Sequence, residues 1–198
     1  MVLPLQPALT PPPPWWRRTL ALGSVFAALG VIALLSGPRL QPPRLLADGP
    51  GRDPQALGAA VRLISGAQQY VWVAMYVVRP DDDGPVHELL AGLAEAHRRG
   101  VDVRVVLDLD DQETGKNQAA TDWLRGQGIR VVLDETKITS HGKVLLVDGR
   151  QALVGSHNWT RSALTKNREV SVILVDATSL ADLAAWFAEV PGWAEGNP

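Results

Sequence analysis

The sequence contains no cysteine and only a small imbalance of charge, and both features exclude classes of protein. With no cysteine among 198 residues, the chain has no disulfides, no cysteine-ligated zinc and no thiol nucleophile. The formal net charge is −2, so the protein has no overall positive field that would attract a polyanionic partner. Four histidines are the scarce reactive groups, and the length and 46% hydrophobic content are typical of a single domain.

The N-terminal part differs from the rest in composition. A proline-rich head over residues 1–18 ends in two tryptophans and two arginines, and an uncharged apolar run over residues 19–36 follows. That run is near the lower limit of about 17 residues for crossing a bilayer, and tryptophan beside arginine suits a membrane–water interface. We interpret it as a transmembrane anchor. The alternative is a cleaved signal segment, but the run leads directly into Pro38, which is a poor cleavage context.

Flanking charge and proline content suggest how the rest of the chain is arranged. Arg17, Arg18 and the terminal amine slightly outweigh Arg39 and Arg44, which favours a cytoplasmic N-terminus and a single-pass protein with its domain on the extracytoplasmic side. The sequence then predicts a proline-rich linker over residues 37–52, a folded domain over 53–190 and a tail over 191–198.

From residue 53 onward, apolar spacing alternates between helical and extended patterns. Asp53 is expected to cap a first helix, and Asp148-Gly149 is a strong signal for a hairpin whose strands pair antiparallel. The fold class expected is α/β, a mixed β-sheet sandwiched between α-helices, preceded by the transmembrane helix. Helices are predicted over 53–65, 86–99, 119–125 and 177–190, and strands over 70–78, 101–109, 129–134, 143–148, 152–156 and 169–176.

Polar side chains stand at regular offsets around the predicted hairpin. Because strand side chains alternate between faces, His141 and Lys143 share one face, and Ser156 and Asn158 also share one. With a simple register, these four hydrogen-bond donors converge at one end of the sheet, where they suit a phosphate group. No cluster of Asp, Glu and His has metal-ligand spacing, so we expect no metal and no cofactor. His141 is then the candidate nucleophile, because an imidazole can attack phosphorus directly.

These residues also carry a resemblance to a known family. His141, Lys143, Asp148, Gly155, Ser156 and Asn158 fit the pattern H-x-K-x4-D-x6-G-S-x-N, which is the signature of the phospholipase D superfamily. Asn167 and Glu169 are placed much as in members with a single motif. Residues 53–186 resemble the small bacterial phospholipase D-like endonucleases, and the layout with an anchor resembles mitochondrial cardiolipin hydrolase.

The resemblance implies a mechanism and an oligomeric state. In the family, one motif histidine attacks phosphorus and a second, from another motif copy, protonates the leaving oxygen. This chain has one copy, so the resemblance implies a homodimer in which each His141 faces the other across a two-fold axis. Lys143, Ser156 and Asn158 would hold the phosphate oxygens, and Glu169 would orient His141. Asp148 and Gly155 would have structural roles.

Several residues near the motif are expected to surround the site. Trp159 follows Asn158 and is expected to line the substrate entrance, whereas His157 is predicted to be structural. Arg161, Lys166 and Arg168 would either steer an anionic substrate or solvate a loop. Three tryptophans fit core positions better than a stacking surface: Trp72, Trp123 and Trp186.

The sequence leaves the substrate open between a phospholipid and a nucleic acid. From Gly49 onward, the chain has 15 Lys and Arg against 20 Asp and Glu, which lacks the basic surface that double-stranded DNA requires. A membrane anchor would raise the effective concentration of lipid headgroups. A tethered endonuclease would have the same features, and a phosphate-binding scaffold without turnover is a third alternative, although the complete motif argues against it.

Overall fold

A computed structural model describes residues 42–109, 115–134 and 139–194. The predicted head and anchor lie outside these residues. In the part of the chain that is described, no helix combines the length and hydropathy needed to span a bilayer.

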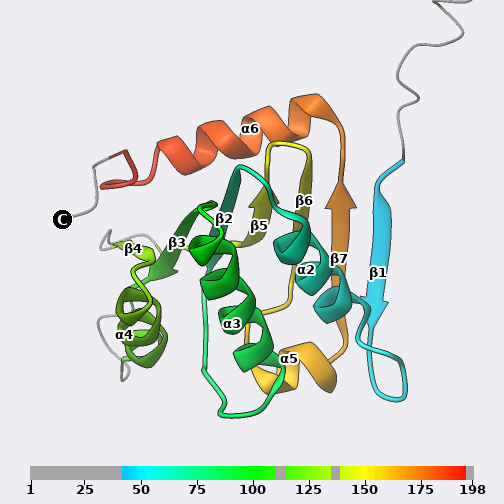
Figure 1. Cartoon of the computed structure of the whole chain (residues 1–198). Coiled ribbons are helices and arrows are strands. Elements are labelled where there is room, and N and C mark those ends of the chain that lie inside the picture. The colour runs from blue at the N-terminus through cyan, green and yellow to red at the C-terminus, as the bar shows by residue number, and fades with distance from the viewer. Residues whose placement is uncertain (1–41, 110–114, 135–138, 195–198) are drawn as a thin grey trace, which may run out of the picture. The chain divides into compact units, whose positions relative to one another are not determined.

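A seven-stranded mixed sheet forms the centre of the described fold, in the order β1-β7-β6-β5-β2-β3-β4 (Figure 1). Strands β2, β3 and β4 pair in parallel, and every other pairing is antiparallel. The prediction of a mixed sheet flanked by helices is therefore confirmed. The strands are β1 (Arg44–Asp48), β2 (Tyr70–Met75), β3 (Asp102–Asp108), β4 (Arg130–Asp134), β5 (Lys143–Val147), β6 (Gln151–Gly155) and β7 (Glu169–Leu174).

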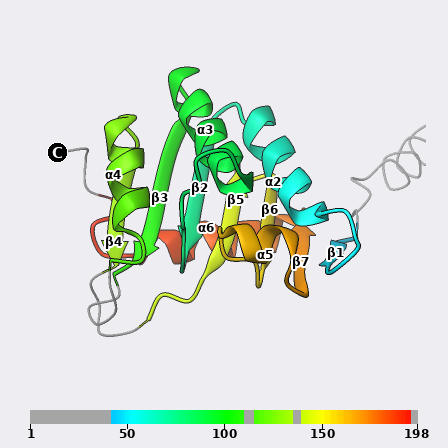
Figure 2. The ribbon, with the colours of Figure 1, turned by 90° about the horizontal axis from the view of Figure 1, so that it is seen from below.

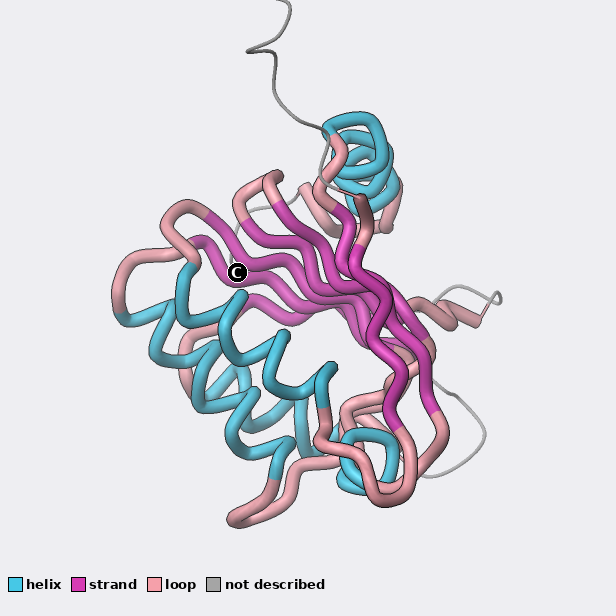
Figure 3. The backbone as a smooth tube through the Cα atoms, turned by 90° about the vertical axis from the view of Figure 1, so that its right-hand side faces the viewer, coloured by secondary structure: helices cyan, strands magenta, loops and turns pink. Residues whose placement is uncertain are grey.

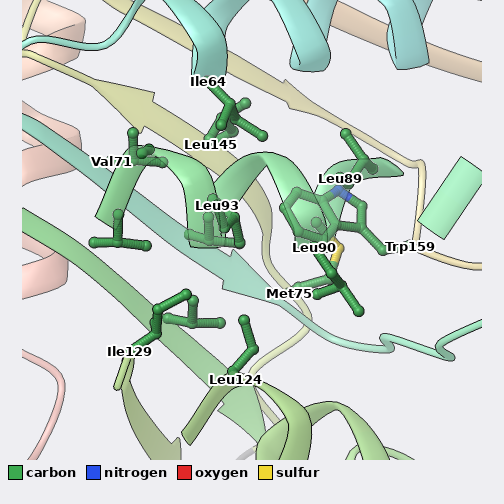
Figure 4. Packing of buried hydrophobic residues seen from close by; sticks show 14 of the residues in the cluster. Ile64, Val71, Met75, Leu89, Leu90, Leu93, Leu124, Ile129, Leu145 and Trp159 are labelled. Carbon is green, nitrogen blue, oxygen red and sulfur yellow. The ribbon is translucent and has the colours of Figure 1, made fainter. Parts of the chain in front are cut away.

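The helices divide unequally between the two faces of the sheet (Figures 2 and 3). They are α2 (Gln55–Gly66), α3 (Pro85–Arg98), α4 (Gln118–Gly126), α5 (Arg161–Thr165) and α6 (Ala177–Ala188). The first four contribute to the larger hydrophobic core, in which Leu90, Leu93 and Leu145 pack together (Figure 4). Among the described helices, α6 alone covers the other face, where Leu180 and Phe187 are buried. Helix α5 was not predicted, because five residues are too few to show helical spacing.

Strand β1 lies inside the segment that was expected to be a linker, so that expectation is wrong for residues 44–48. The strand pairs antiparallel with β7, and Leu46 is fully buried. Its last residue also replaces the predicted helix cap: the Asp48 carboxylate accepts the backbone N–H groups of Gln55 and Ala56 at 2.9 and 3.0 Å. Asp53 does not cap α2, because the pairing of β1 brings Asp48 to the first turn instead.

The predicted β5–β6 hairpin is confirmed, and Asp148 anchors its turn. Asp148 and Gly149 both have positive φ, of 55° and 60°. The Asp148 carboxylate accepts backbone N–H groups from Gln68, Gln69 and Tyr70 at 2.8 to 2.9 Å. Burial works to raise the pKa of Asp148, but these three donors and the Arg150 charge hold it below its usual value. The turn is thereby tied to the loop between α2 and β2.

Replacing Asp148 with asparagine is expected to lower the free energy of unfolding by about 1 kcal/mol at pH 7, because the N–H donors lose a charged acceptor that is partly exposed to solvent. Asparagine tolerates positive φ, so the change tests the charge. A carboxylate with a lowered folded-state pKa stabilises above its unfolded pKa of about 3.9 and loses this effect as the pH falls through the folded value. Urea unfolding at pH 7 and pH 3 should show a difference that shrinks on acidification. The control is Asp182→Asn, which is exposed on α6; equal effects of the two changes at pH 7 would contradict the role of Asp148.

Candidate active site

The elements that carry the predicted catalytic residues meet at one edge of the sheet, at the bottom of Figure 1, whereas Asp148 lies at the opposite edge. The parallel strands β2, β3 and β4 end at this edge, β5 and β7 begin there, and β6 ends there. Ligand sites of α/β proteins usually lie at the carboxyl ends of parallel strands. Polar side chains at this edge include Tyr76, Asp108, His141, Lys143, Ser156 and Glu169.

His141 and Lys143 contact each other directly. The Lys143 side chain is only 8% exposed, whereas His141 is exposed to solvent. Lys143 Nζ donates to the His141 carbonyl oxygen at 2.9 Å and lies 3.0 Å from His141 Nδ1. The chain therefore presents an accessible imidazole backed by a largely buried amine.

Tyr76 packs beside this pair, and it could not be predicted as part of the site because its only distinguishing feature is a position near the end of an apolar run. Its ring centre lies 4.4 Å from that of His141, and Lys143 Nζ lies 4.7 Å from the Tyr76 ring centre. An ammonium over an aromatic face is attracted by the ring's quadrupole. Tyr76 thus packs against both members of the pair.

The charge on Lys143 is balanced between burial and nearby carboxylates. Desolvation lowers the pKa of Lys143, and the negative charges of Glu169 and Asp108 oppose that change. Asp108 is buried at the end of β3, and its carboxylate also accepts the backbone N–H of Ser140. Asp108 therefore fixes the chain just before His141 and supports the ammonium form of Lys143.

Glu169 contacts different partners from those predicted. Ser156 Oγ donates to one Glu169 oxygen, and Asn167 Nδ2 donates to the other at 3.0 Å. No hydrogen bond joins Glu169 to His141 within the described residues, where Lys143 is the neighbour of His141 Nδ1. In the described residues β7 aligns Glu169 with Ser156, so a role of Glu169 in orienting His141 stays a prediction.

Asn158 and His157 face different surroundings, as alternation along an extended segment requires. Asn158 Oδ1 is buried and accepts no hydrogen bond from the described residues, although such atoms normally have a partner. His157 is buried, with Nδ1 2.8 Å from Ser171 Oγ and Nε2 3.0 Å from Asp48 Oδ2. The prediction that His157 is structural is confirmed: it joins the segment after β6 to β7 and β1.

Two predictions about surrounding side chains are corrected, for Trp159 and Trp186, and the roles of Arg161 and Lys166 stay predictions. Trp159 is 4% exposed and packs in the larger core beside Leu90 and Met75, so it does not line an entrance (Figure 4). Arg161 forms ion pairs with the carboxylates of Asp81 and Asp83 at 3.2 and 3.0 Å, which hold α5 against the loop before α3. Lys166, which follows α5, is exposed. Trp186 was expected in the core but is 36% exposed. Its ring lies close to Gly142: a Cβ atom added to this glycine would be 3.4 Å from the ring.

Asn117 is a buried brace that the sequence analysis missed. Its Oδ1 accepts the Val78 N–H at 2.8 Å, and its Nδ2 donates to the carbonyl oxygens of Tyr76 and Asp108 at 2.9 Å. Asn117 therefore ties together the chain after β2 and the end of β3. Asparagine is common at the position just before a helix, and this was the feature of the sequence that could have drawn attention to Asn117.

The fold and this site together define a phospholipase D-like α/β protein. Nuc of Salmonella typhimurium, a phospholipase D family member of known crystal structure, superimposes with a TM-score of 0.64 and 24% identity, covering 79% of this chain and 97% of Nuc. The sequence profile of the family described as "Cardiolipin synthase, PLD-like domain" matches residues 60–191. The chain belongs to this family, and so to the phospholipase D superfamily.

Two curated relatives give the same assignment at the level of sequence. Mitochondrial cardiolipin hydrolase of Chlamydomonas reinhardtii is 31% identical over 134 residues, covering 68% of this chain and 56% of the relative. Mitochondrial cardiolipin hydrolase of Homo sapiens is 31% identical over 143 residues, covering 72% of this chain and 53% of the relative. The chain thus spans little more than half the length of either relative.

Proposed function

We propose that this chain is a metal-independent phosphodiesterase that forms a phosphohistidine at His141. The observation that carries the proposal is the direct contact between an exposed imidazole and the buried amine of Lys143, beside Ser156 and Glu169 at one sheet edge. Membership of the phospholipase D superfamily supports it.

The reaction would proceed in two displacements. The lone pair of His141 Nε2 attacks phosphorus, a P–N bond forms, and the P–O bond to the leaving group breaks. The leaving oxygen takes a proton from a second imidazole. A water molecule then attacks phosphorus and transfers one of its own protons to the second imidazole. The P–N bond breaks, which releases the phosphomonoester and restores His141.

The contact with Lys143 affects which nitrogen of His141 carries the hydrogen, and therefore whether Nε2 can attack phosphorus. An ammonium only donates, so while it contacts Nδ1 the neutral ring carries its hydrogen on Nε2. Attack from Nε2 requires the hydrogen on Nδ1 instead. A bound phosphate would draw Lys143 Nζ toward a phosphate oxygen, which frees Nδ1 to take that hydrogen. The same amine would then stabilise the charge on phosphorus.

The remaining polar side chains would hold the other phosphate oxygens. Ser156 Oγ is bonded to Glu169 in the described structure, so it would turn from this carboxylate toward the phosphate. Asn158 would donate an N–H of its Nδ2 to a phosphate oxygen.

The second imidazole would come from a second copy of the chain. One motif supplies one His141, and a homodimer with two-fold symmetry would bring two of them together at a single shared site. The predicted anchor at residues 19–36 would keep this site close to a lipid surface. A domain on the extracytoplasmic side remains a prediction.

Hydrolysis is expected to persist in excess EDTA, because the proposed steps use imidazoles and an amine rather than a metal. The full chain, purified in detergent, would be offered cardiolipin, single-stranded DNA and RNA in parallel, and phosphatidic acid or shortened oligonucleotides would be measured. Rapid acid-free quenching and mass spectrometry should find phosphate on His141. Activity that disappears with EDTA would contradict the mechanism, and binding of all three without turnover would favour the phosphate-binding scaffold.

A further inference from the structure

Tyr76 is held in the candidate site by its backbone from two sides. Its N–H donates to the carbonyl oxygen of Gly142 at 2.9 Å, and its own carbonyl oxygen accepts from the buried Asn117. Gly142 separates His141 from Lys143 in the chain, so this bond fixes Tyr76 relative to both. The side-chain contacts of Tyr76 with these two residues are made by its ring.

The ammonium of Lys143 is largely enclosed by the protein, so its charge needs favourable partners. Lys143 is 8% exposed and borders a small cavity of about 20 Å³, which Met75, Leu145 and Leu164 also line. A buried charge is costly unless nearby groups compensate for it. Two compensating groups belong to His141, whose carbonyl oxygen and Nδ1 lie 2.9 and 3.0 Å from Lys143 Nζ.

The other charged or titratable groups around Lys143 do not bond to its amine in the described part of the chain. The carboxylates of Asp108 and Glu169 accept hydrogen bonds from other groups. His157 lines the same cavity, but both of its ring nitrogens have other partners. Lys116 Nζ lies 5.7 Å from the Tyr76 ring centre and adds a like charge to this region. The two carboxylates therefore act on Lys143 only through space.

The ring of Tyr76 compensates the Lys143 charge at closer range. Lys143 Nζ lies 4.7 Å from the ring centre, within the distance of about 6 Å at which the ring quadrupole attracts an ammonium. A hydrogen bond weakens steeply when its angle changes, whereas this attraction does not depend on one N–H direction. The ring can therefore keep its hold on the amine through a small movement that breaks the contact with His141 Nδ1.

We propose that Tyr76 is a positioning residue for Lys143: its ring holds the ammonium beside His141 and keeps it in place when a bound phosphate draws it away from Nδ1. The inference rests on the proposed function, in which Lys143 makes that movement. The same ring packs against the imidazole, with 4.4 Å between the ring centres, so one side chain positions both groups. The role belongs to the ring rather than to the tyrosine hydroxyl.

The test changes the charge distribution of the ring while keeping its shape. Tyr76→Phe is the reference, and phenylalanine with one, two or five fluorine atoms at the same position weakens the quadrupole in steps. Desolvation lowers the pKa of Lys143, and a ring that attracts the ammonium less should lower this pKa further. We expect the titration midpoint of Lys143 to fall at each step, by about half a pH unit or more over the series.

The midpoint is measured by NMR of the full chain in detergent, with lysine labelled with ¹³C at Cε. The chain has four lysines, and Lys143→Arg identifies the signal to follow. This titration needs no substrate and no turnover. The kinetic measurement is the pH profile of kcat/KM for whichever of cardiolipin, single-stranded DNA or RNA is hydrolysed. Because the ammonium form is required, the loss of activity on the alkaline side should begin at a lower pH with each step.

The matched control is the same fluorinated series at Phe187, a buried ring of α6 whose neighbours are the rings of Trp72, Trp186 and Trp193. It should leave the Lys143 midpoint unchanged. A midpoint that does not follow fluorination at Tyr76, or that follows it equally at Phe187, would overturn the inference. A graded midpoint with an unchanged pH profile would overturn the role in the reaction. A graded midpoint without any hydrolysis would support the hold on Lys143 and contradict the proposed function alone.

Discussion

Replacing His141 with alanine is expected to reduce phosphodiester hydrolysis by at least about 10,000-fold, because the proposed covalent step has no other nucleophile. The side chain is exposed and its polar contacts are with Lys143, so the free energy of unfolding should change by less than about 0.5 kcal/mol. Initial rates and urea unfolding on the same preparation measure both quantities. The control is His87→Ala, an exposed histidine on α3. Residual activity above about 1% would remove His141 as the nucleophile.

Mixing this variant with the unaltered chain tests the shared site. If each dimer needs both imidazoles, equal co-expression with random pairing leaves about a quarter of the dimers active, because only pairs of unaltered chains retain both. If each protomer acts alone, half of the activity remains. Differently tagged chains allow the mixed dimer to be purified, and an active mixed dimer would contradict the requirement for two imidazoles.

Replacing Gly155 with alanine is expected to destabilise the domain by about 3 kcal/mol or more, because β7 approaches too closely for a side chain. A Cβ at this position would overlap Ser171 Oγ and the Val170 carbonyl oxygen, and would lie 2.6 Å from Ser171 Cα. Those atoms belong to a paired strand and to the buried His157 bond, so they cannot move aside cheaply. Urea unfolding of the full chain measures the loss.

The matched control for this change is Gly66→Ala at the end of α2. A Cβ at Gly66 has no heavy atom within 4 Å, so the substitution should be neutral or slightly stabilising. If Gly155→Ala does not fold, hydrogen exchange on the purified unaltered chain should still show the amides of β6 and β7 among the most protected. A Gly155→Ala protein as stable as the Gly66→Ala protein would contradict the close approach.

Local sequence patterns, such as alternation along a strand or a turn motif, were enough to predict the elements in which those patterns are clear. Alternation of side chains placed His141 with Lys143, and the Asp148-Gly149 turn gave the β5–β6 hairpin. Strand β1 could not be predicted in this way, because five residues among prolines show little periodicity and the strand depends on pairing with β7.

The errors at the site have a common physical origin in long-range packing. Trp159 was placed by its sequence neighbour Asn158, but its backbone joins Val77 and Arg79, which directs the ring into the core. The contacts of Glu169 with Ser156 and Asn167 were also not foreseen from the sequence. Partners of this kind depend on strand register, which no local pattern specifies.

The position of β1 has a practical consequence for truncated recombinant forms. A chain begun at Asp53 would lack the strand that covers the outer side of β7. The uncovered N–H and C=O groups would be free to recruit a strand from another molecule, which is a route to aggregation. It would also lack Asp48, so a ring nitrogen of the buried His157 would lose its acceptor. Soluble fragments should therefore start upstream of Arg44.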